Sequence, residues 1–377
     1  MNVAYLYPWD VVGDPSAPGR LADLGVQAVA LAASYHSTRA ATPYHPAHRV
    51  LDVPHSAFYL PIRPAAWSRL IPAAPTWTPA DAYLQARDAL KAVGLQVHAW
   101  TVLTHNSHLG TANPDLTVRN AFGDPYPYAL CPAHEDVIEY CERLVQEVLE
   151  IGEPDGLILE ACGPMGFGHQ SVHEKTSGAD WTPVDIDLLS LCFCTSCSPR
   201  YPSATKAAVR AAIDRSTTTA PSAPSTIEEA LGTFTDEVRA VRVSLSTTLR
   251  ERLVSTAKRI APNLPITLHA NPDPWATGAF APLPSGEPDA DVLVANCWGD
   301  PTSDAIRLTR LKDLSTTGQR VGAYVLTLPP RPANPDTLAD HLRTYAKAGA
   351  SEFHLYHAGL ASPQRLAALS EALRLHR

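Results

Sequence analysis

The sequence predicts an α/β protein of the (β/α)8, or TIM, barrel class, and three observations carry that prediction. Eight short runs rich in β-branched and aromatic residues recur along the chain, helical patterns separate them, and several of the runs are apolar throughout. Continuous apolar runs are typical of parallel strands that are buried on both faces. Eight such strands alternating with helices favour a closed barrel, and an open doubly wound sheet is the alternative.

The expected strands leave room for a helix between most neighbours. They span residues 3–7, 26–35, 95–103, 156–160, 265–270, 291–296, 320–327 and 352–356. The runs VQAVALAA and DVLVAN show the continuous apolar character most clearly. We therefore expect all eight strands to be parallel and to contribute to one central sheet.

Helical patterns with recognisable ends fill the intervals between these strands. Proline opens and glycine closes the helix expected at residues 78–94, as the usual asymmetry of helix ends predicts. In residues 134–151 the apolar side chains recur with the 3.6-residue period of an amphipathic helix. Further helices are expected at residues 227–260, 302–314, 335–348 and 363–375.

Two connections are much longer than the others, residues 36–77 after the second strand and residues 161–264 after the fourth. Both lead from a strand to a helix, and in a barrel such connections lie at the C-terminal face, where active sites form. The sequence therefore predicts one barrel domain over residues 1–377, with 161–264 as an insertion that carries a cysteine cluster and a long helix.

Composition and charge narrow the classes of partner. Of 377 residues, 45% are apolar and 18% charged, and the formal net charge is −8 without a run of Lys and Arg. Neither nucleic acid nor anionic lipid is an expected partner of such a chain. No apolar run approaches the roughly 18 residues of a membrane helix, and the first residues lack the features of a signal peptide. We expect a cytoplasmic protein. Assembly into a homo-oligomer is compatible with the sequence.

The stretch SLCFCTSCSPRY places three of the seven cysteines, Cys192, Cys194 and Cys197, within six residues. In a reducing compartment, clustered thiols more often hold a metal than form disulfides. Soft thiolates favour zinc, and a tetrahedral structural zinc needs a fourth ligand of the same kind. Cys131 and Cys162 are the two candidates for that ligand.

The ends of the expected strands gather aromatic rings, histidines, asparagines and carboxylates. Flat apolar rings stack on pyranose rings and fixed polar groups bind hydroxyls, so this lining favours a carbohydrate substrate. The predicted substrate-binding residues are Trp9, Asp10, Tyr35, His36, His105, Asn106, His173, Glu174, Asn271, Trp298, Tyr324 and Tyr356.

Glu160 follows the apolar run GLIL directly, at the end of the fourth expected strand. Burying a carboxylate there is costly without a purpose, and the mouth of a barrel can raise its pKa enough for general acid catalysis. The alternative interpretation is a structural carboxylate paired with Arg or Lys at the rim of the barrel.

Residues 130–201 resemble the glycoside hydrolase family 42 β-galactosidases, which are barrel enzymes with the catalytic acid/base after the fourth strand. The shared order is LCP at Cys131, a helix, LILEACG with Glu160, and then CFCTSC. The resemblance implies Cys131 as the fourth zinc ligand, with Cys162 in reserve, and Glu160 as the acid/base. The rest of the chain is most similar to uncharacterised actinobacterial glycoside-hydrolase-like proteins, through the stretches at residues 105–110 and 173–175.

The chain departs from that family at two places. Leu159 precedes Glu160 where the family carries asparagine, and AYVLTLPPRP after the seventh expected strand lacks the nucleophilic glutamate. Most glycosidases need a second carboxylate. Asp300, in NCWGD, is the favoured choice, although an aspartate before proline is also a typical N-cap. Asp273, Asp10 and Glu174 are the other choices.

The sequence therefore predicts a glycoside hydrolase that acts on a small oligosaccharide or glycoside, with a structural zinc. One alternative is a sugar-binding barrel without catalysis, which would explain the bare end of the seventh strand. The other is a metal-dependent hydrolase or isomerase of a polyol, with His169, His173 and Glu174 as metal ligands.

Overall fold

The computed structural model describes residues 1–169, 174–216, 224–283 and 290–376. Eight parallel strands form a closed barrel, and the eight strands expected from the sequence are the strands of this barrel. They are β1 (Asn2–Leu6), β2 (Ala28–Tyr35), β6 (Gln96–Val102), β9 (Gly156–Glu160), β10 (Ile266–Asn271), β12 (Val292–Cys297), β13 (Arg320–Leu326) and β14 (Glu352–Tyr356).

The sheet closes at β1. Val3 lies opposite His354 of β14 on one side and opposite Ala28 of β2 on the other. Both pairings are parallel, so no edge of the sheet is left open and the open doubly wound alternative is excluded. All eight strands are almost entirely buried, which explains why several of their sequences are apolar throughout.

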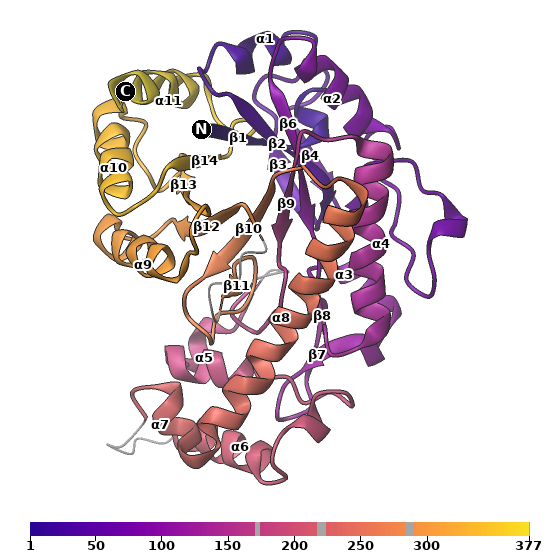
Figure 1. Ribbon diagram of the computed structural model, residues 1–377, viewed down its shortest axis with the longest axis vertical. Helices are drawn as coiled ribbons and strands as arrows, with labels where there is room; N and C mark the ends of the chain where they lie inside the picture. Colours follow the sequence, from indigo (N-terminus) through magenta and orange to yellow (C-terminus); the bar gives the residue numbers. More distant parts are fainter. Residues whose placement is uncertain (170–173, 217–223, 284–289, 377) are drawn as a thin grey trace.

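Helices surround the barrel (Figure 1). They are α1 (Ala17–Ala22), α2 (Ala82–Lys91), α3 (Ser107–Ala112), α4 (Glu135–Gly152), α5 (Pro183–Leu189), α6 (Thr205–Ser216), α7 (Ile227–Leu231), α8 (Thr235–Ile260), α9 (Pro301–Leu314), α10 (Pro335–Lys347) and α11 (Pro363–His376). The single helix expected at residues 227–260 is divided. Gly232 takes a φ of +53° between α7 and α8, a left-handed conformation that ends the first helix.

Short strands and 3-10 turns extend the connections between these elements. β3 (Thr38–Ala41) pairs with β4 (Val50–Val53), β7 (Thr117–Arg119) pairs with β8 (Pro125–Leu130), β5 (Ala57–Phe58) adds to β2, and β11 (Ala281–Pro282) adds to β10. Single 3-10 turns lie at Pro8–Asp10, Pro64–Ala66, Pro114–Leu116, Ser177–Ala179, Ser198–Arg200 and Gly232–Phe234.

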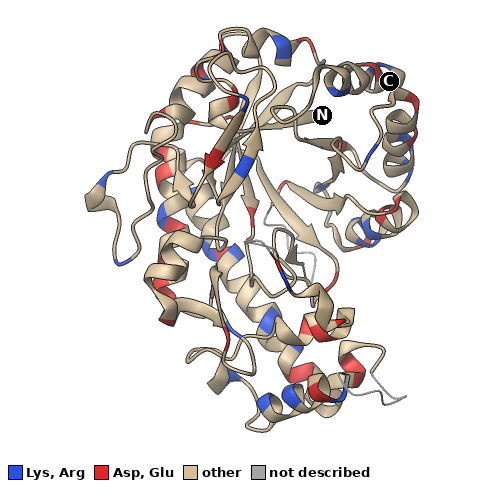
Figure 2. Cartoon of the chain, turned by 180° about the vertical axis from the view of Figure 1, so that it is seen from behind, with Lys and Arg blue, Asp and Glu red and all other residues tan. Residues whose placement is uncertain are grey.

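A lobe extends beyond one end of the barrel (Figure 1). It contains α5, α6, α7, the hairpin of β7 and β8, and the first half of α8, whose second half returns along α4 to the barrel. On the outer helices Lys and Arg alternate with Asp and Glu and do not gather into a basic face (Figure 2). Within the described residues, no helix combines the length and the apolar character needed to cross a membrane.

The barrel interior contains polar side chains as well as aliphatic ones. Tyr5, His98, His269, His354 and Glu352 are all at most 2% exposed. The ring of His98 lies close to Gly156, where an added Cβ would approach the ring carbon Cγ to 2.8 Å. The lack of a side chain at Gly156 is therefore what allows a histidine to fill this layer of the barrel.

We expect Gly156→Ala to lower the free energy of unfolding by about 1–3 kcal/mol, because the methyl group overpacks the layer that holds His98. Gly19→Ala in α1 is the matched control, since no atom lies within 4 Å of its added Cβ. Gly19→Ala is expected to raise the free energy of unfolding by at most about 1 kcal/mol. Urea unfolding of both variants checks this, and equal effects of the two substitutions would contradict the tight packing at Gly156.

Candidate functional site

A cavity of about 510 Å³ opens where the barrel strands end. Its wall combines aromatic rings, amides, histidines and one carboxylate. The lining residues are Tyr35, His36, Trp100, Glu160, His169, Asn271, Thr277, Ala279, Phe280, Asn296, Trp298, Gly299, Arg307, Tyr324 and Tyr356. A concave site of this size, with a few polar groups among aromatic rings, is typical of small-molecule binding.

Glu160 is the one carboxylate that the described residues contribute to this wall. It is the last residue of β9 and is 6% exposed. Its Oε2 accepts a hydrogen bond from Nε1 of Trp100 at 2.7 Å and lies 3.3 Å from Nδ1 of His269. Trp100 comes from β6 and His269 from β10, the strands on either side of β9, so the barrel itself positions both partners.

These partners decide the protonation state of the carboxylate. Burial raises the pKa of Glu160, but His269, Trp100 and His36 outweigh that effect and hold its pKa below the ordinary value of 4.5. The sequence led us to expect a raised pKa at this position, and the structure gives the opposite direction. Glu160 is therefore a carboxylate anion near neutral pH, a form that accepts hydrogen bonds or a proton and cannot donate one.

Two histidines, His36 and His169, line the cavity, and a third, His105, packs against both. The rings of His36 and His105 stack with centroids 4.2 Å apart, and His169 meets His105 edge-on at 4.5 Å. Burial lowers the pKa of all three, to about 4 for His36. Nδ1 of His36 donates to the carbonyl of Ser37 at 2.8 Å, which leaves Nε2 as an acceptor in the neutral ring.

Three stacked or tilted aromatic rings also line the cavity. Trp298 stacks on Tyr324 with centroids 5.5 Å apart and planes 13° apart, and Tyr356 lies 4.8 Å from Trp298. Trp298 is 37% exposed, which is unusual for a residue of its size. An indole face that is held in place and still reaches solvent is a ready platform for the apolar face of a ligand.

Seven residues expected at the site line the cavity together: Tyr35, His36, Glu160, Asn271, Trp298, Tyr324 and Tyr356. His105 lies directly behind His36. Trp9 is buried against Tyr7, with ring centroids 4.5 Å apart, and Asn106 is the N-cap of α3. Glu174 accepts a hydrogen bond from Thr176 at 3.4 Å, and His173 lies outside the described residues.

Asp300, the favoured second carboxylate, and Asp10, one of the other choices, do not line this cavity. Asp300 is exposed and is the N-cap of α9, where it accepts hydrogen bonds from the backbone N–H groups of Thr302 and Ser303. Asp10 accepts from the backbone N–H of Tyr7 and faces Gly359, beside a separate small cavity. Sequence reasoning had named the N-cap as the alternative for Asp300, and that is the role its contacts describe.

Some residues of the wall were not among the predicted site residues. Trp100 lines the cavity and His269 lies behind it, 3.3 Å from Glu160; both lie in expected strands, so their strand positions were a usable signal. Arg307 lies inside α9 and donates to the carbonyl of Asn296 at 2.7 Å and to Asp304 at 2.8 Å. Nothing in the local sequence marks Arg307 as a residue that turns back toward the barrel.

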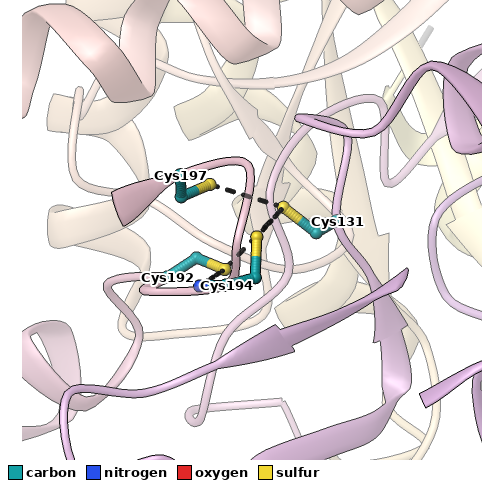
Figure 3. Close-up of side chains that lie close together, drawn as sticks. All are labelled: Cys131, Cys192, Cys194 and Cys197. Carbon is teal, nitrogen blue, oxygen red and sulfur yellow. Dashed lines mark hydrogen bonds between the residues drawn. The ribbon is translucent and has the colours of Figure 1, made fainter. Parts of the chain in front are cut away.

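Four buried cysteines form a second site, away from the barrel interior (Figure 3). Their sulfur atoms all lie within 4.8 Å of one another, and the sulfur of Cys131 is 3.5, 3.7 and 3.8 Å from those of Cys197, Cys192 and Cys194. Figure 3 shows the four side chains turned toward one common point. Cys162, the other candidate, is not a member of this group.

The spacing of the sulfur atoms fits a metal ion. A tetrahedral thiolate site with metal–sulfur distances of about 2.3 Å places its sulfur atoms about 3.8 Å apart, close to the separations found here. The backbone N–H of Cys194 also points to the sulfur of Cys192 at 3.5 Å. The four cysteines are therefore a site that can hold a metal, formed by residues that are all at most 5% exposed.

The cysteine cluster adjoins the loop that supplies His169 to the cavity. Phe193 donates its backbone N–H to the carbonyl of Arg119, and the backbone N–H of Phe167 donates to Oγ of Ser190 at 2.9 Å. The hydroxyl of Tyr128 donates to the carbonyl of Gly166 at 3.0 Å. These bonds join the cysteine loop, the β7–β8 hairpin and residues 166–169 into one connected wall.

Comparisons with known structures place the fold among glycoside hydrolases. The α-L-fucosidase isoenzyme 2 from Paenibacillus thiaminolyticus is 11% identical with a TM-score of 0.55, over 99% of this chain and 48% of that one. The β-galactosidase from the psychrophilic Marinomonas ef1 is 11% identical with a TM-score of 0.57, over 99% of this chain and 59% of that one. Gan42B, a GH42 β-galactosidase from G. stearothermophilus, is 9% identical with a TM-score of 0.53, over 100% of this chain and 56% of that one.

The chain spans about half the length of these structures, and identities near one residue in ten show a shared fold alone. No protein-family model matches the chain, and a search of curated protein sequences finds no match either. The GH42 enzymes are thus among the structural neighbours that the resemblance implied. The predicted similarity to actinobacterial proteins stays a prediction.

The raised pKa of Asp10 predicts that the free energy of unfolding depends on pH. Burial raises its pKa to about 7, although the Tyr7 N–H and Arg20 act in the opposite direction. Between the unfolded pKa of about 3.9 and 7, the folded state holds a proton that the unfolded state has lost, so stability falls as the pH rises through this range. We expect Asp10→Asn to raise the free energy of unfolding by roughly 1–4 kcal/mol at about pH 8 and hardly at all at about pH 4.

Urea unfolding at several pH values measures this effect. The exposed Asp23 offers a matched control, because Asp23→Asn removes a carboxylate that is already in water. If Asp10→Asn raised the free energy of unfolding equally at every pH, the assigned pKa of Asp10 would be wrong.

Proposed function

We propose that this protein binds a small, uncharged carbohydrate in the mouth of its glycoside-hydrolase-type barrel. The observation that carries the proposal is the placement of a single ionised carboxylate, Glu160, in a cavity walled by Trp298, Tyr324 and Tyr356. The volume of about 510 Å³ lies within the range of small-molecule sites.

The chemistry of the wall suits a sugar. One face of a pyranose is formed by C–H groups and packs on an indole or phenol ring, as Trp298 and Tyr324 would offer. Hydroxyl groups need acceptors and donors at fixed positions, and Glu160, Asn271 and Asn296 supply them. A buried anion that accepts hydrogen bonds from ligand hydroxyls contributes more to the free energy of binding than a neutral acceptor does, because charge-assisted hydrogen bonds are stronger.

Hydrolysis of a glycoside is the second candidate function. It is favoured by the position of Glu160 at the end of the fourth barrel strand, the place that the family resemblance assigns to the acid/base. Most glycosidases require two carboxylates, whereas the described wall supplies one, and the lowered pKa of Glu160 suits a base or nucleophile better than an acid. These two observations make binding the leading proposal.

The metal-dependent alternative receives no comparable support. Among the described residues, the cysteine cluster is the one group with the geometry of a metal site, and His169 packs against His105 instead. We propose that the four cysteines hold a structural zinc. That ion would join Cys131, between β8 and α4, to the loop of Cys192, Cys194 and Cys197, and so fix the wall beside the cavity.

We expect wild-type protein to bind at least one member of a panel of neutral mono- and disaccharides, with a change in tryptophan fluorescence, since Trp100 and Trp298 line the cavity. Glu160→Gln is expected to weaken binding by roughly tenfold or more, the loss of one charge-assisted hydrogen bond. Asp300→Asn is the control, because asparagine is also a good N-cap and the residue lies outside the cavity.

The same panel, offered as aryl glycosides, separates the two candidate functions. Release of sugar by the wild type that Glu160→Gln abolishes would favour hydrolysis. Binding without release supports the leading proposal. If no saccharide binds, or if Glu160→Gln binds as the wild type does, the proposed site is wrong.

Zinc content provides a separate check on the cysteine cluster. We expect about one zinc per chain by elemental analysis, as four thiolates in tetrahedral spacing hold one ion. Cys131→Ala should lose the metal and melt at a lower temperature, whereas Cys162→Ala should keep it. Retention of zinc by Cys131→Ala, or its loss from Cys162→Ala, would contradict the assignment.

A further inference from the structure

A second cavity, of about 210 Å³, adjoins the cavity at the barrel mouth. The two cavities share Asn271, which ends β10, and Arg307, which lies in α9. We call the second cavity the side groove, because residues 271–273 form one of its walls and α9 forms the other. A ligand that fills the barrel mouth can therefore extend past Asn271 and Arg307 into the side groove.

One face of α9 forms its wall of the side groove. The residues of this face are Ser303, Ile306, Arg307 and Arg310, which follow the i, i+3, i+4, i+7 spacing of a single helical stripe. Ile306 is 53% exposed, a large value for an aliphatic side chain. The stripe thus offers an open aliphatic surface and two guanidinium groups, one helical turn apart, to a ligand in the groove.

Arg307 is held in place at the boundary between the two cavities. Its Nη1 donates to the carbonyl of Asn296 at 2.7 Å and to Asp304 at 2.8 Å. Asp304 is fully buried and also lies 3.7 Å from Nη2 of Arg331, so one carboxylate is shared by two guanidinium groups. Within the described residues, no hydrogen bond occupies Nε or Nη2 of Arg307, and these donors remain available to a ligand.

Arg310 is the second cation of the side groove. It is exposed, and no hydrogen bond or ion pair joins it to another described residue. Arg307 and Arg310 are three residues apart, a separation at which two side chains on a helix are neighbours and can reach one group. Guanidinium groups bind planar and tetrahedral oxyanions through paired N–H donors.

The acidic residues near the side groove are turned to other partners. Asp273 lines the groove, but its Oδ1 accepts from the backbone N–H of Trp275 at 2.9 Å, and its charge acts on Arg242 of α8. Asp300 accepts from backbone N–H groups in the first turn of α9. Oδ1 of Asn271 accepts from the backbone N–H of Asp273 at 3.0 Å, which leaves the side-chain amide of Asn271 as a donor. The groove therefore offers more free donors than acceptors.

We propose that the ligand is an acidic saccharide, with an uncharged unit in the barrel mouth and a neighbouring unit that places one oxyanion, a uronate carboxylate or a sulfate ester, between Arg307 and Arg310. The inference rests on the proposed function of the barrel mouth and adds the chemical class of the ligand beyond it. The C–H face of the acidic unit packs on Ile306, and its oxyanion accepts charge-assisted hydrogen bonds from the two arginines.

The negative charge of the ligand belongs outside the barrel mouth. Glu160 is itself an anion there, so a second anion beside it would be repelled and would lose its water without gaining a cation. Arg307 lines both cavities, whereas Arg310 lines the side groove alone. The two cavities therefore divide the ligand into a neutral part and an acidic part.

The test compares neutral disaccharides with two acidic derivatives of each, in which a uronic acid or a sulfate ester replaces one primary hydroxyl group. We expect the wild type to bind at least one acidic derivative roughly tenfold more tightly than its neutral parent, the gain from one charge-assisted interaction. Titration calorimetry measures the affinities, and the derivative with the larger gain identifies the oxyanion. Equal binding of parent and derivatives would overturn the proposal.

Arg310→Gln removes the unpartnered guanidinium and leaves the residues of the barrel mouth unchanged. We expect this variant to lose the preference for the acidic derivative and to bind the neutral parent as the wild type does. Lys312→Gln is the matched control, because it removes one positive charge from the same helix at a side chain that lies beside Gly349. A preference that survives Arg310→Gln, or that falls equally in both variants, would show that the groove does not bind the acidic group.

Failure of the proposed function gives a different pattern from failure of this inference. If neutral sugars bind and the acidic derivatives gain nothing, the barrel mouth stands and the side groove is wrong. If neither neutral sugars nor acidic derivatives bind, both are wrong. If acidic derivatives alone bind and Arg310→Gln removes that binding, the side groove stands without a site for neutral sugars.

Discussion

Closure of the barrel is the constraint on which the rest of this structure depends. Because β1 pairs with both β14 and β2, the inward-facing side chains of eight strands share one dry interior. Polar groups placed there have no water and must satisfy one another. Tyr5 shows the result: its hydroxyl meets rings from β10 and β14, which lie far from it in the sequence and next to it only because the sheet closes.

The same closure explains why Glu160 is an anion. A carboxylate at 6% exposure would be expected to take up a proton, but neighbouring strands deliver an indole N–H and an imidazole to one of its oxygens. The site is therefore defined less by Glu160 than by the strands on either side of it. Glycoside hydrolases with similar barrels show that such a frame can carry sugar chemistry, while this chain has its own set of groups at the strand ends.

Much of the fold could be predicted from the sequence because its signals are local. Strands buried on both faces are rich in apolar, β-branched and aromatic residues, and several are apolar throughout, so all eight barrel strands could be predicted. The residues at strand ends were visible for the same reason, and seven of them meet at one cavity. Asp10 was expected at the cavity, but a 3-10 turn follows β1 and directs its carboxylate to the backbone N–H of Tyr7. The hydrophobic pattern of the sequence does not predict this turn. Arg307 returns to the cavity from within a helix. Cys131 joins cysteines some sixty residues away, and the family resemblance implied that partnership. Neither arrangement follows from a local pattern.

The enclosure of the cysteine cluster has a consequence for the lifetime of any ion bound there. All four cysteines are at most 5% exposed, and backbone hydrogen bonds to Arg119 and Leu116 hold the segments that carry them. An ion in such a pocket leaves only when the surrounding segments open together, so its rate of exchange follows the free energy of that local opening and not the affinity of the thiolates alone. Metal loaded as the chain folds would then be retained over periods much longer than a single ligand-binding event at the barrel mouth.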